Sequence, residues 1–306
     1  MSTASAVSAE RLTKRYGRRR GVQDVSFTVE PEQVCALLGP NGAGKTTTMR
    51  MLVGLSRADS GCARLLGRPS RLAADVLASV GVLIDGPAFV PHLSGWRNLE
   101  LLWRAGGRAW PPPALEASLA LAGLGSALHR RVKSYSMGMR QRLTLAQALM
   151  GAPQVLVLDE PANGLDPGEV RALREHLAAL AENGAAVLIS SHLLAEVELL
   201  ASHVVVLDDG KVLTSGALDR LLQQGSYTFD VDDAPAARAA LRDLPGVDAI
   251  EEQDGRLVVT APQLSAQQLT SRLVAAGVGV SGLRAARRLE DVFLGLVTGG
   301  EDGAAR

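Results

Sequence analysis

Short apolar runs in this chain alternate with stretches of helical spacing or composition. The runs at 34–38, 155–158 and 187–190 contain almost no polar residue, which predicts strands buried on both faces. Between such runs, residues 45–55 and 168–182 are typical of helices. Strands that alternate with helices predict an α/β domain built on a mainly parallel sheet.

Residues 87–128 do not follow this alternation of strands and helices. In residues 87–128, Pro, Gly and Trp punctuate short helical segments, and Pro111-Pro112-Pro113 breaks the chain. Residues 132–150 follow as a loop that runs into a long helix. Further on, apolar runs flank Asp208-Asp209-Gly210, which predicts a hairpin.

A second, smaller domain is expected at 226–298, beyond a boundary near residues 223–226. Its predicted strands and helices follow one another at 227–231, 235–242, 247–252, 256–259, 265–275 and 278–283, with a last helix at 289–296. A turn at Asp254-Gly255 separates the two middle strands. This βαββαβ order predicts a ferredoxin-like α+β domain.

Composition narrows the possible functions. The 306 residues are enough for about two domains of roughly 150 residues each. The 32 basic and 32 acidic residues cancel, and aromatic residues make up only 3%, so we expect no nucleic-acid partner. Neither Cys35 nor Cys62 has a metal-ligand neighbour, and Cys35 is expected to be a core residue. Residues 1–9 have neither a basic start nor an apolar core, so we expect no signal peptide there, and the sequence has no apolar run of about 18 residues that could span a membrane.

The first chemical motif lies between the strand at 34–38 and the helix at 45–55. It is the phosphate-binding loop, or Walker A sequence, Gly39-Pro40-Asn41-Gly42-Ala43-Gly44-Lys45-Thr46-Thr47. Glycines let backbone N–H groups turn toward phosphate oxygens, and the helix that begins there adds the positive end of its dipole. Lys45 would place a cation on the β and γ phosphates of a nucleotide, and Thr46 would offer a hydroxyl to Mg²⁺.

The second motif is the acidic pair Asp159 and Glu160, which ends the apolar strand at 155–158. Ligands of α/β sheets bind at the carboxyl ends of the strands. We expect Asp159 to hold Mg²⁺ through water, and Glu160 to polarise the attacking water as a general base. Together with the phosphate-binding loop, this pair predicts a nucleotide hydrolase.

A third motif, Tyr135-Ser136-Met137-Gly138-Met139-Arg140-Gln141-Arg142, narrows the class of hydrolase. Ser136 and Gly138 are expected at a helix N-terminus, where a phosphate can bind. At this point the chain resembles the ATPase subunit of ATP-binding cassette (ABC) transporters, whose signature is Leu-Ser-Gly-Gly-Gln. It keeps the Ser, the second Gly and the following Gln-Arg, and departs from the signature at Tyr135, Met137 and Met139.

The resemblance covers roughly residues 8–222 and implies a P-loop NTPase fold of the ABC ATPase type. In that fold a mainly parallel sheet is joined by an antiparallel β subdomain and a helical subdomain, here at about 87–145. Three more site residues are implied: Tyr16 for stacking on adenine, Asp166 in the loop that links two active sites, and His192 as the switch histidine at the γ-phosphate. The other histidines match nothing in the family and are expected to be surface or packing residues: His92, His129, His176 and His203.

One departure from the family points to a subgroup. Where the family usually has a glutamine that touches Mg²⁺, this chain has Asp85, with Pro87-Ala88-Phe89 close behind. An acidic residue at that place resembles the bacitracin- and lantibiotic-type exporters, and residues 288–294 are similar to the end of the extra C-terminal domain of drug exporters. A carboxylate is a harder Mg²⁺ ligand than an amide oxygen, so Asp85 is a further candidate metal ligand.

Members of this family sandwich two ATP molecules between two head-to-tail subunits. The resemblance therefore implies an ATP-dependent dimer, with a second copy or a related chain, in which Ser136 and Gly138 of one subunit face the γ-phosphate bound by Lys45 of the other. It also implies separate integral-membrane permease subunits that dock on residues 87–128 and Asp85 at the cytoplasmic face of the plasma membrane. Export, and a cargo such as a drug, an antibiotic peptide or another amphiphile, rest on resemblance alone.

Three alternatives fit less well. A soluble ABC ATPase that acts on nucleic acid or ribosomes usually carries two cassettes or long insertions, whereas this chain has one cassette and no net charge. A cassette that only binds or regulates has no need for its full set of catalytic residues. A P-loop kinase or GTPase has no need of Ser136, Gly138 and His192, and the guanine-reading sequence Asn-Lys-x-Asp is absent.

We expect Asp85→Gln to change the metal dependence of ATP hydrolysis, because the substitution replaces a charged oxygen ligand with a neutral one. The measurement is the hydrolysis rate titrated with Mg²⁺ and, separately, with Mn²⁺. Identical responses in the parent chain and the variant would contradict a role for Asp85 at the metal.

Overall fold

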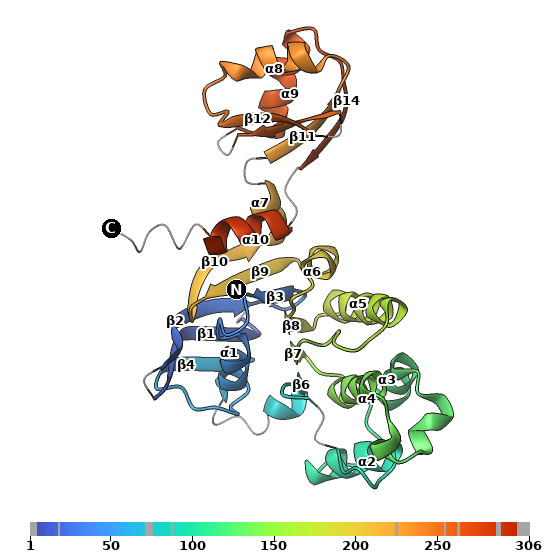
Figure 1. The fold of residues 1–306 in the computed structure, drawn as a ribbon. Coiled ribbons are helices and arrows are strands. Elements are labelled where there is room, and N and C mark those ends of the chain that lie inside the picture. The colour runs from blue at the N-terminus through green and yellow to red at the C-terminus, as the bar shows by residue number, and fades with distance from the viewer. Residues whose placement is uncertain are drawn as a thin grey trace. The chain divides into compact units, whose positions relative to one another are not determined.

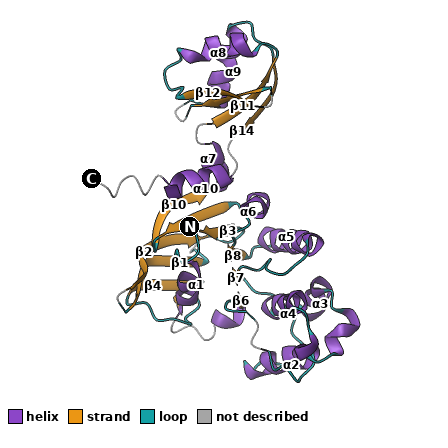
Figure 2. Ribbon diagram, viewed as in Figure 1, coloured by secondary structure: helices purple, strands orange, loops and turns teal. Residues whose placement is uncertain are grey.

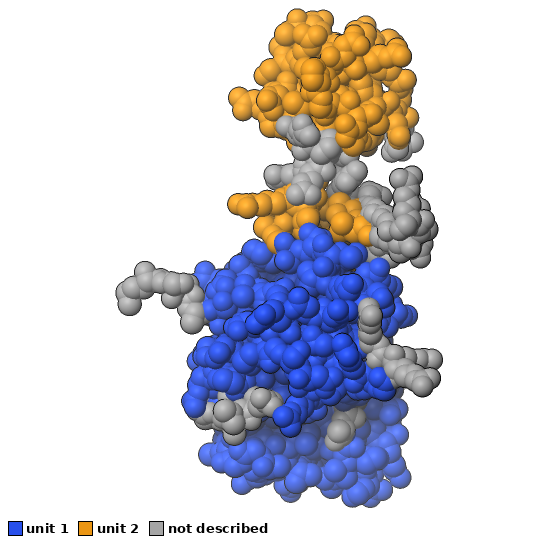
Figure 3. Space-filling model, turned by 90° about the vertical axis from the view of Figure 1, so that its left-hand side faces the viewer, with its two compact units in different colours: residues 1–193, 199–215 blue, residues 194–198, 216–306 orange. Residues whose placement is uncertain are grey.

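The computed structural model describes residues 5–17, 19–70, 76–86, 89–223, 226–253, 255–261, 264–285 and 289–298 (Figure 1). The chain divides into two compact units (Figure 3). Unit 1 comprises residues 1–193 and 199–215, and unit 2 comprises residues 194–198 and 216–306. Within the described residues, every helix is too short or too polar to cross a bilayer.

Unit 1 is built on a six-stranded sheet whose inner strands are apolar along their length. In spatial order the strands are β10 (Lys211–Ala217), β9 (His203–Asp208), β3 (Val34–Leu38), β8 (Ala186–Ser190), β7 (Val155–Asp159) and β6 (Val80–Leu83). The five strands from β9 to β6 pair in parallel, and β9 and β10 form the predicted hairpin. Every residue of β3 and β8 is buried, which explains why their sequences do not alternate.

A second, antiparallel sheet completes the core of unit 1. Its order is β2 (Arg19–Val29), β1 (Val7–Tyr16), β4 (Ser60–Leu65) and β5 (Arg68–Pro69). Helix α1 (Lys45–Leu52) packs between the sheets, against β1, β2, β4 and β7. Met49 and Leu52 of this helix are fully buried in one hydrophobic cluster with residues of both sheets. The fold is therefore the predicted P-loop type, with a parallel sheet joined by an antiparallel one.

Helices α4 (Met137–Leu149) and α5 (Pro167–Glu182) pack on the parallel sheet, and α3 (Leu115–Ala122) packs on both of them (Figure 2). Helix α2 (Gly95–Ala105) lies further from the sheet, and 3₁₀ turns lie at Val76–Ser79, Gly125–His129 and Val132–Ser134. Asn98 of α2 is fully buried, and its side chain forms hydrogen bonds with the backbone of Val90 and Ser94. These bonds fix the backbone just before the helix. Pro87 and Ala88, part of the exporter-like sequence, lie outside the described residues.

The main part of unit 2 has the predicted βαββαβ order. The elements are β11 (Ser226–Val231), α8 (Ala234–Arg242), β12 (Ala249–Gln253), β13 (Arg256–Thr260), α9 (Ala266–Ala275) and β14 (Val280–Ala285). The sheet order β12-β13-β11-β14, antiparallel throughout, is that of a ferredoxin-like domain. Both helices lie on one face of the sheet (Figure 2), over a core that contains the fully buried Phe229.

Two strands of unit 2 begin later than the sequence predicts. Val247 and Val278 were expected to open strands, but β12 begins at Ala249 and β14 at Val280. The Val278 N–H instead donates to the Leu273 carbonyl at 3.1 Å, which closes the end of α9. A valine buried in a helix-ending turn has the same apolar signature as the first residue of a strand.

Three short helices complete unit 2. They are α6 (Leu194–Leu200), whose first residues belong to this unit, α7 (Leu218–Gln223) and α10 (Leu289–Thr298). α7 and α10 pack against each other, and the Leu289 N–H donates to Glu198 Oε2 at 3.0 Å. This hydrogen bond ties the first turn of α10 to α6.

Candidate functional site

The phosphate-binding loop connects the end of β3 to the start of α1. Gly42 and Gly44 have φ angles of 87° and 102°, which only glycine adopts readily. A Cβ atom on Gly44 would also lie 2.4 Å from the side chain of Val22, so this position has no room for any other residue. The Lys45 ammonium, almost buried, donates to the Gly39 carbonyl at 2.6 Å and to the Pro40 carbonyl at 3.2 Å. Carbonyl groups of the loop thus bind the ammonium group of Lys45, which belongs to the same loop.

Asp159 lies at the centre of a hydrogen-bond chain beneath this loop. Thr46 Oγ1 donates to Asp159 Oδ2 at 2.7 Å, and Ser190 Oγ donates to Asp159 Oδ1 at 2.5 Å. The Ser190 hydroxyl in turn accepts from the Glu160 N–H at 2.9 Å. Each oxygen of the Asp159 carboxylate therefore has a hydroxyl donor, which fixes its orientation.

Thr46 and Asp159 form a donor set that suits Mg²⁺. A hydroxyl and a carboxylate are hard oxygen ligands, and Mg²⁺ in nucleotide sites takes only one or two protein ligands together with phosphates and water. The two groups are already in contact through their 2.7 Å hydrogen bond, at the edge of the groove that the phosphate-binding loop lines. The residues present therefore fit a magnesium ion bound with a nucleotide.

Glu160 and His192 form a second pair at the same edge of the sheet. His192 Nδ1 lies 2.7 Å from Glu160 Oε2, although the two residues are 32 apart in the sequence. Glu160 adopts a left-handed backbone with a φ of 49°, which is uncommon outside glycine. Gln141 donates to the carbonyls of Glu160 and Pro161 at 3.3 and 2.9 Å, and so holds this turn. The Glu160 backbone is thus held by Gln141 and Ser190, and its carboxylate contacts His192.

Tyr16 lies at the rim of the same groove. The groove is lined by Tyr16, Gly21, residues 41–47, Asp159 and Glu160. The Tyr16 side chain is 48% exposed, and the ring lies so close to Gly21 that a Cβ atom there would be 3.0 Å from it. An exposed aromatic ring beside a phosphate-binding loop can stack on a planar base.

Ser136 and Gly138 do not line this groove. Ser136 caps α4 by accepting from the Met139 N–H at 3.2 Å, and Met137 is 68% exposed. Gly138 lies against the loop before α5, where an added Cβ atom would be 2.5 Å from the Gly164 carbonyl oxygen. Asp166 ends that loop as the cap of α5, in a reciprocal capping box with Glu169. The signature residues therefore belong to a surface separate from the Lys45 groove of the same chain.

Asp85 lines a neighbouring groove and is paired with a cation. This groove also includes Asp159, Glu160, Met137 and Arg140. Arg50 Nε donates to Asp85 Oδ2 at 2.8 Å, and its terminal nitrogen NH2 contacts Asp85 Oδ1. The hydrogen bond to Asp85 raises the pKa of Arg50. Both oxygens of Asp85 are therefore occupied by Arg50.

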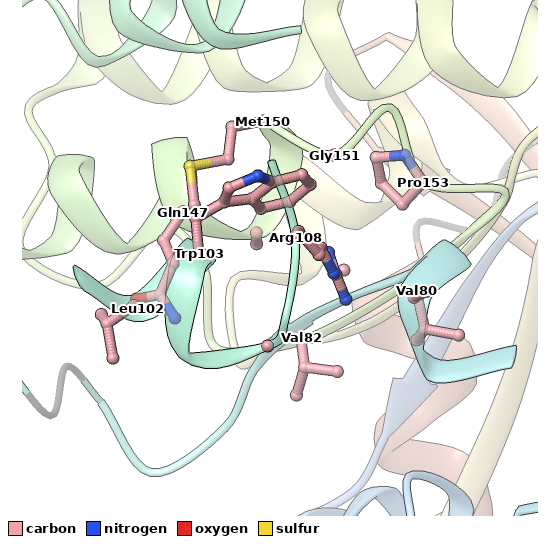
Figure 4. A pocket seen from close by; sticks show the side chains of 13 residues that line it. Val80, Val82, Leu102, Trp103, Arg108, Gln147, Met150, Gly151 and Pro153 are labelled. Carbon is pink, nitrogen blue, oxygen red and sulfur yellow. The ribbon is translucent and has the colours of Figure 1, made fainter. Parts of the chain in front are cut away.

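A separate pocket lies where α2, the end of α4 and the edge strand β6 meet (Figure 4). Its volume is about 190 Å³. Trp103 and Met150 flank one side and Val80 and Val82 the other, with Arg108 between them. The Arg108 guanidinium lies 4.4 Å from the centre of a Trp103 ring. This pocket combines an apolar wall with a cation.

Sequence reasoning missed Ser190 and Arg50, and it noted Gln141 as part of the signature sequence without giving it a contact. Ser190 is the one polar residue of β8, and a hydroxyl at the end of an apolar strand is a weak signal. Arg50 is 35 residues from its partner, so no local pattern could reveal the pair. Cys35 is a core residue as predicted, and burial raises the pKa of its thiol to about 12. Burial also lowers the pKa of His176, which suits a packing role.

Comparison with known proteins agrees with this geometry. The family model for ABC transporters matches residues 22–163. The uncharacterized ABC transporter ATP-binding protein YdbJ of Bacillus subtilis (strain 168) is 35% identical over 293 residues, covering 94% of this chain and 94% of the relative. The bacitracin transport ATP-binding protein BcrA of Enterococcus faecalis is 33% identical over 299 residues, covering 96% and 97%.

A solved structure shows the same fold. The dimeric structure of a bacterial ABC transporter cassette aligns with a TM-score of 0.63 at 20% identity, covering 69% of this chain and 98% of the cassette. This chain belongs to the family of ABC transporter ATP-binding proteins. Its cassette is an ATPase, as the resemblance predicted, and the soluble non-transport alternative is not favoured.

We expect Ser190→Ala to lower ATP hydrolysis by about tenfold or more. The substitution removes one hydrogen bond to the Asp159 carboxylate and leaves the Glu160 N–H without its acceptor, and a bond to a charged group contributes about 1.5–3 kcal/mol. The measurement is steady-state hydrolysis at saturating ATP. Ser191→Ala is the matched control, because the Ser191 hydroxyl accepts from the Leu193 N–H. Equal rates in the two variants would contradict the role of Ser190.

Proposed function

We propose that this chain is the ATP-hydrolysing subunit of an exporter and works through separate membrane subunits. The observation that supports this most directly is the hydrogen-bond chain from Thr46 through Asp159 and Ser190 to Glu160, which ends at His192. We infer from it that Glu160 is a general base and His192 the residue that orients it, both close to the phosphate-binding loop. That combination suits hydrolysis better than nucleotide binding alone.

In the proposed mechanism each side chain has a distinct task. Lys45 leaves its loop carbonyls to bind the β and γ phosphates, joined by the backbone N–H groups of residues 41–47. Tyr16 stacks on the adenine. Thr46 and Asp159 would hold Mg²⁺, which neutralises phosphate charge when bound. Asp85 remains a candidate ligand whose carboxylate would first have to leave Arg50.

The hydrolytic step rests on Glu160 and His192. Glu160 accepts the proton of the attacking water as general base, and the water oxygen attacks the γ-phosphorus while the bond to the β-phosphate oxygen breaks. His192, 2.7 Å from the Glu160 carboxylate, orients that group and contacts the γ-phosphate. The left-handed turn at Glu160 is held by Gln141 and Ser190, so the base is positioned before the nucleotide arrives.

A second subunit would complete the site. Ser136 and Gly138 lie outside the Lys45 groove of their own chain, and their helix N-terminus is suited to a phosphate from another chain. The cassette with the same fold is described as dimeric, which supports a head-to-tail dimer here. Asp166 caps α5 next to this surface and would contribute to the contact between the two sites.

Membrane permease subunits would dock on residues 87–128 and near Asp85. The pocket formed by Trp103, Arg108 and the β6 edge offers an apolar wall and a cation for such a contact. The chain would thereby be held at the cytoplasmic face of the plasma membrane. The similarity to a bacitracin transport protein favours a cargo that is an antibiotic peptide, a drug or another amphiphile.

Glu160→Gln is expected to trap a closed dimer in the presence of ATP and Mg²⁺. Glutamine keeps the size of the side chain but cannot accept the proton, so ATP stays intact and continues to bridge the two subunits. Size-exclusion chromatography with light scattering measures the mass with ATP and with ADP. A variant that stays monomeric with ATP would count heavily against the dimer scheme.

Purification of the chain from native membranes in mild detergent is expected to recover a stoichiometric polytopic membrane protein, identified by mass spectrometry. Arg108→Glu should lower that recovery, because it reverses the charge of the pocket. Arg64→Glu, in the antiparallel sheet, is the control for charge reversal elsewhere. Recovery of the chain only from the soluble fraction, alone or with ribosomes, would contradict a transport function.

A further inference from the structure

One face of α1 contacts two carboxylates at the same edge of the parallel sheet. Thr46 and Arg50 are four residues apart in this helix and therefore point the same way. Thr46 bonds Asp159 at the end of β7, and Arg50 bonds Asp85 just beyond the end of β6. β6 and β7 are neighbours that pair in parallel, so these two strand ends lie side by side.

Asp85 and Asp159 nevertheless have different partners. Within the described residues, the hydrogen-bond donors to the Asp159 carboxylate are two neutral hydroxyls, those of Thr46 and Ser190. Asp85 has a guanidinium that occupies both of its oxygens, the two-pronged geometry in which arginine binds carboxylates most strongly. α1 therefore gives one carboxylate a neutral hydroxyl partner and the other a cationic partner.

The groove beyond this pair already contains negative charge. Asp85, Asp159 and Glu160 all line it, and they lie beside the loop that would bind a polyphosphate. An unpaired Asp85 would repel those phosphates through a medium of moderate dielectric constant. Asp85 also has a left-handed backbone with a φ of 65°, so its side chain is aimed by an unusual turn as well as by Arg50.

We propose that Arg50 is a positioning residue of the nucleotide site. It turns Asp85 toward α1 and pairs its charge, so that Asp85 adds no uncompensated negative charge to that of Asp159 and Glu160 beside the phosphates. The pair also ties the helix that begins at Lys45 to the segment that leads into α2. This inference rests on the proposed function, because it assumes that the groove binds a nucleotide polyphosphate.

A double-mutant cycle on nucleotide binding tests the proposal. The affinity of the full chain for ADP, with no metal added, is measured by titration calorimetry for the parent, R50Q, D85N and the double variant. R50Q is expected to weaken ADP binding about fivefold, because Asp85 becomes an uncompensated charge. In the D85N background the same substitution should change the affinity by less than about twofold, because no charge remains to be exposed.

Two further variants distinguish the effect of the positive charge at residue 50 from that of its two-pronged contact, and from an effect of any arginine substitution. Arg50→Lys keeps the charge but loses the two-pronged contact, so it should recover part of the affinity that R50Q loses. Arg64→Gln is the matched control, since Arg64 forms an ion pair with Glu10 in the antiparallel sheet and should leave ADP binding unchanged. Thermal unfolding of each variant shows whether the fold persists.

Three results are distinguishable. An equal loss from R50Q in both backgrounds would mean that Arg50 acts on the nucleotide without Asp85, and would overturn the inference. An R50Q variant that binds ADP as tightly as the parent would also overturn it. If the parent chain is folded but does not bind ADP, that result would instead contradict the proposed function itself.

Discussion

The parallel pairing of β6, β7, β8 and β3 is the constraint on which the site depends. Parallel strands place their carboxyl ends at one edge, and each of these four strands leads to candidate site residues. The phosphate-binding loop follows β3, Asp85 follows β6, Asp159 and Glu160 lie at the end of β7, and Ser190 ends β8 shortly before His192. Burial of the strands fixes the register, and the register fixes which side chains meet.

The sequence predicts candidate residues for the site, but it does not predict the contacts between them. Lys45, Asp159 and Glu160 are predicted from local patterns, the phosphate-binding loop and the acidic end of an apolar strand, whereas His192 is predicted from the resemblance to ABC ATPases. Ser190 and Arg50 could not, because their partners are 31 and 35 residues away and only the fold brings them together. The fold class was also predictable from local apolar and helical patterns. The starts of β12 and β14 were not, because the valines expected to begin them lie in turns that follow helices.

Asp85 shows how a local substitution depends on its neighbours. From sequence alone, an acid in place of the usual glutamine predicts a harder metal ligand. In the structure its charge is matched by an arginine from the helix that starts at the phosphate-binding loop. The chemistry of the position is therefore set by two residues together, one of which has no signal in the sequence.

The contact between Gly138 and Gly164 has a mechanical consequence. With only 2.5 Å available for a Cβ atom, the start of α4 and the loop before α5 fit too tightly to slide past each other. Gln141, one turn further along α4, bonds the carbonyls of Glu160 and Pro161. A shift of the turn at Glu160 would therefore move the exposed start of α4 with it, because the two segments are joined too tightly to move separately.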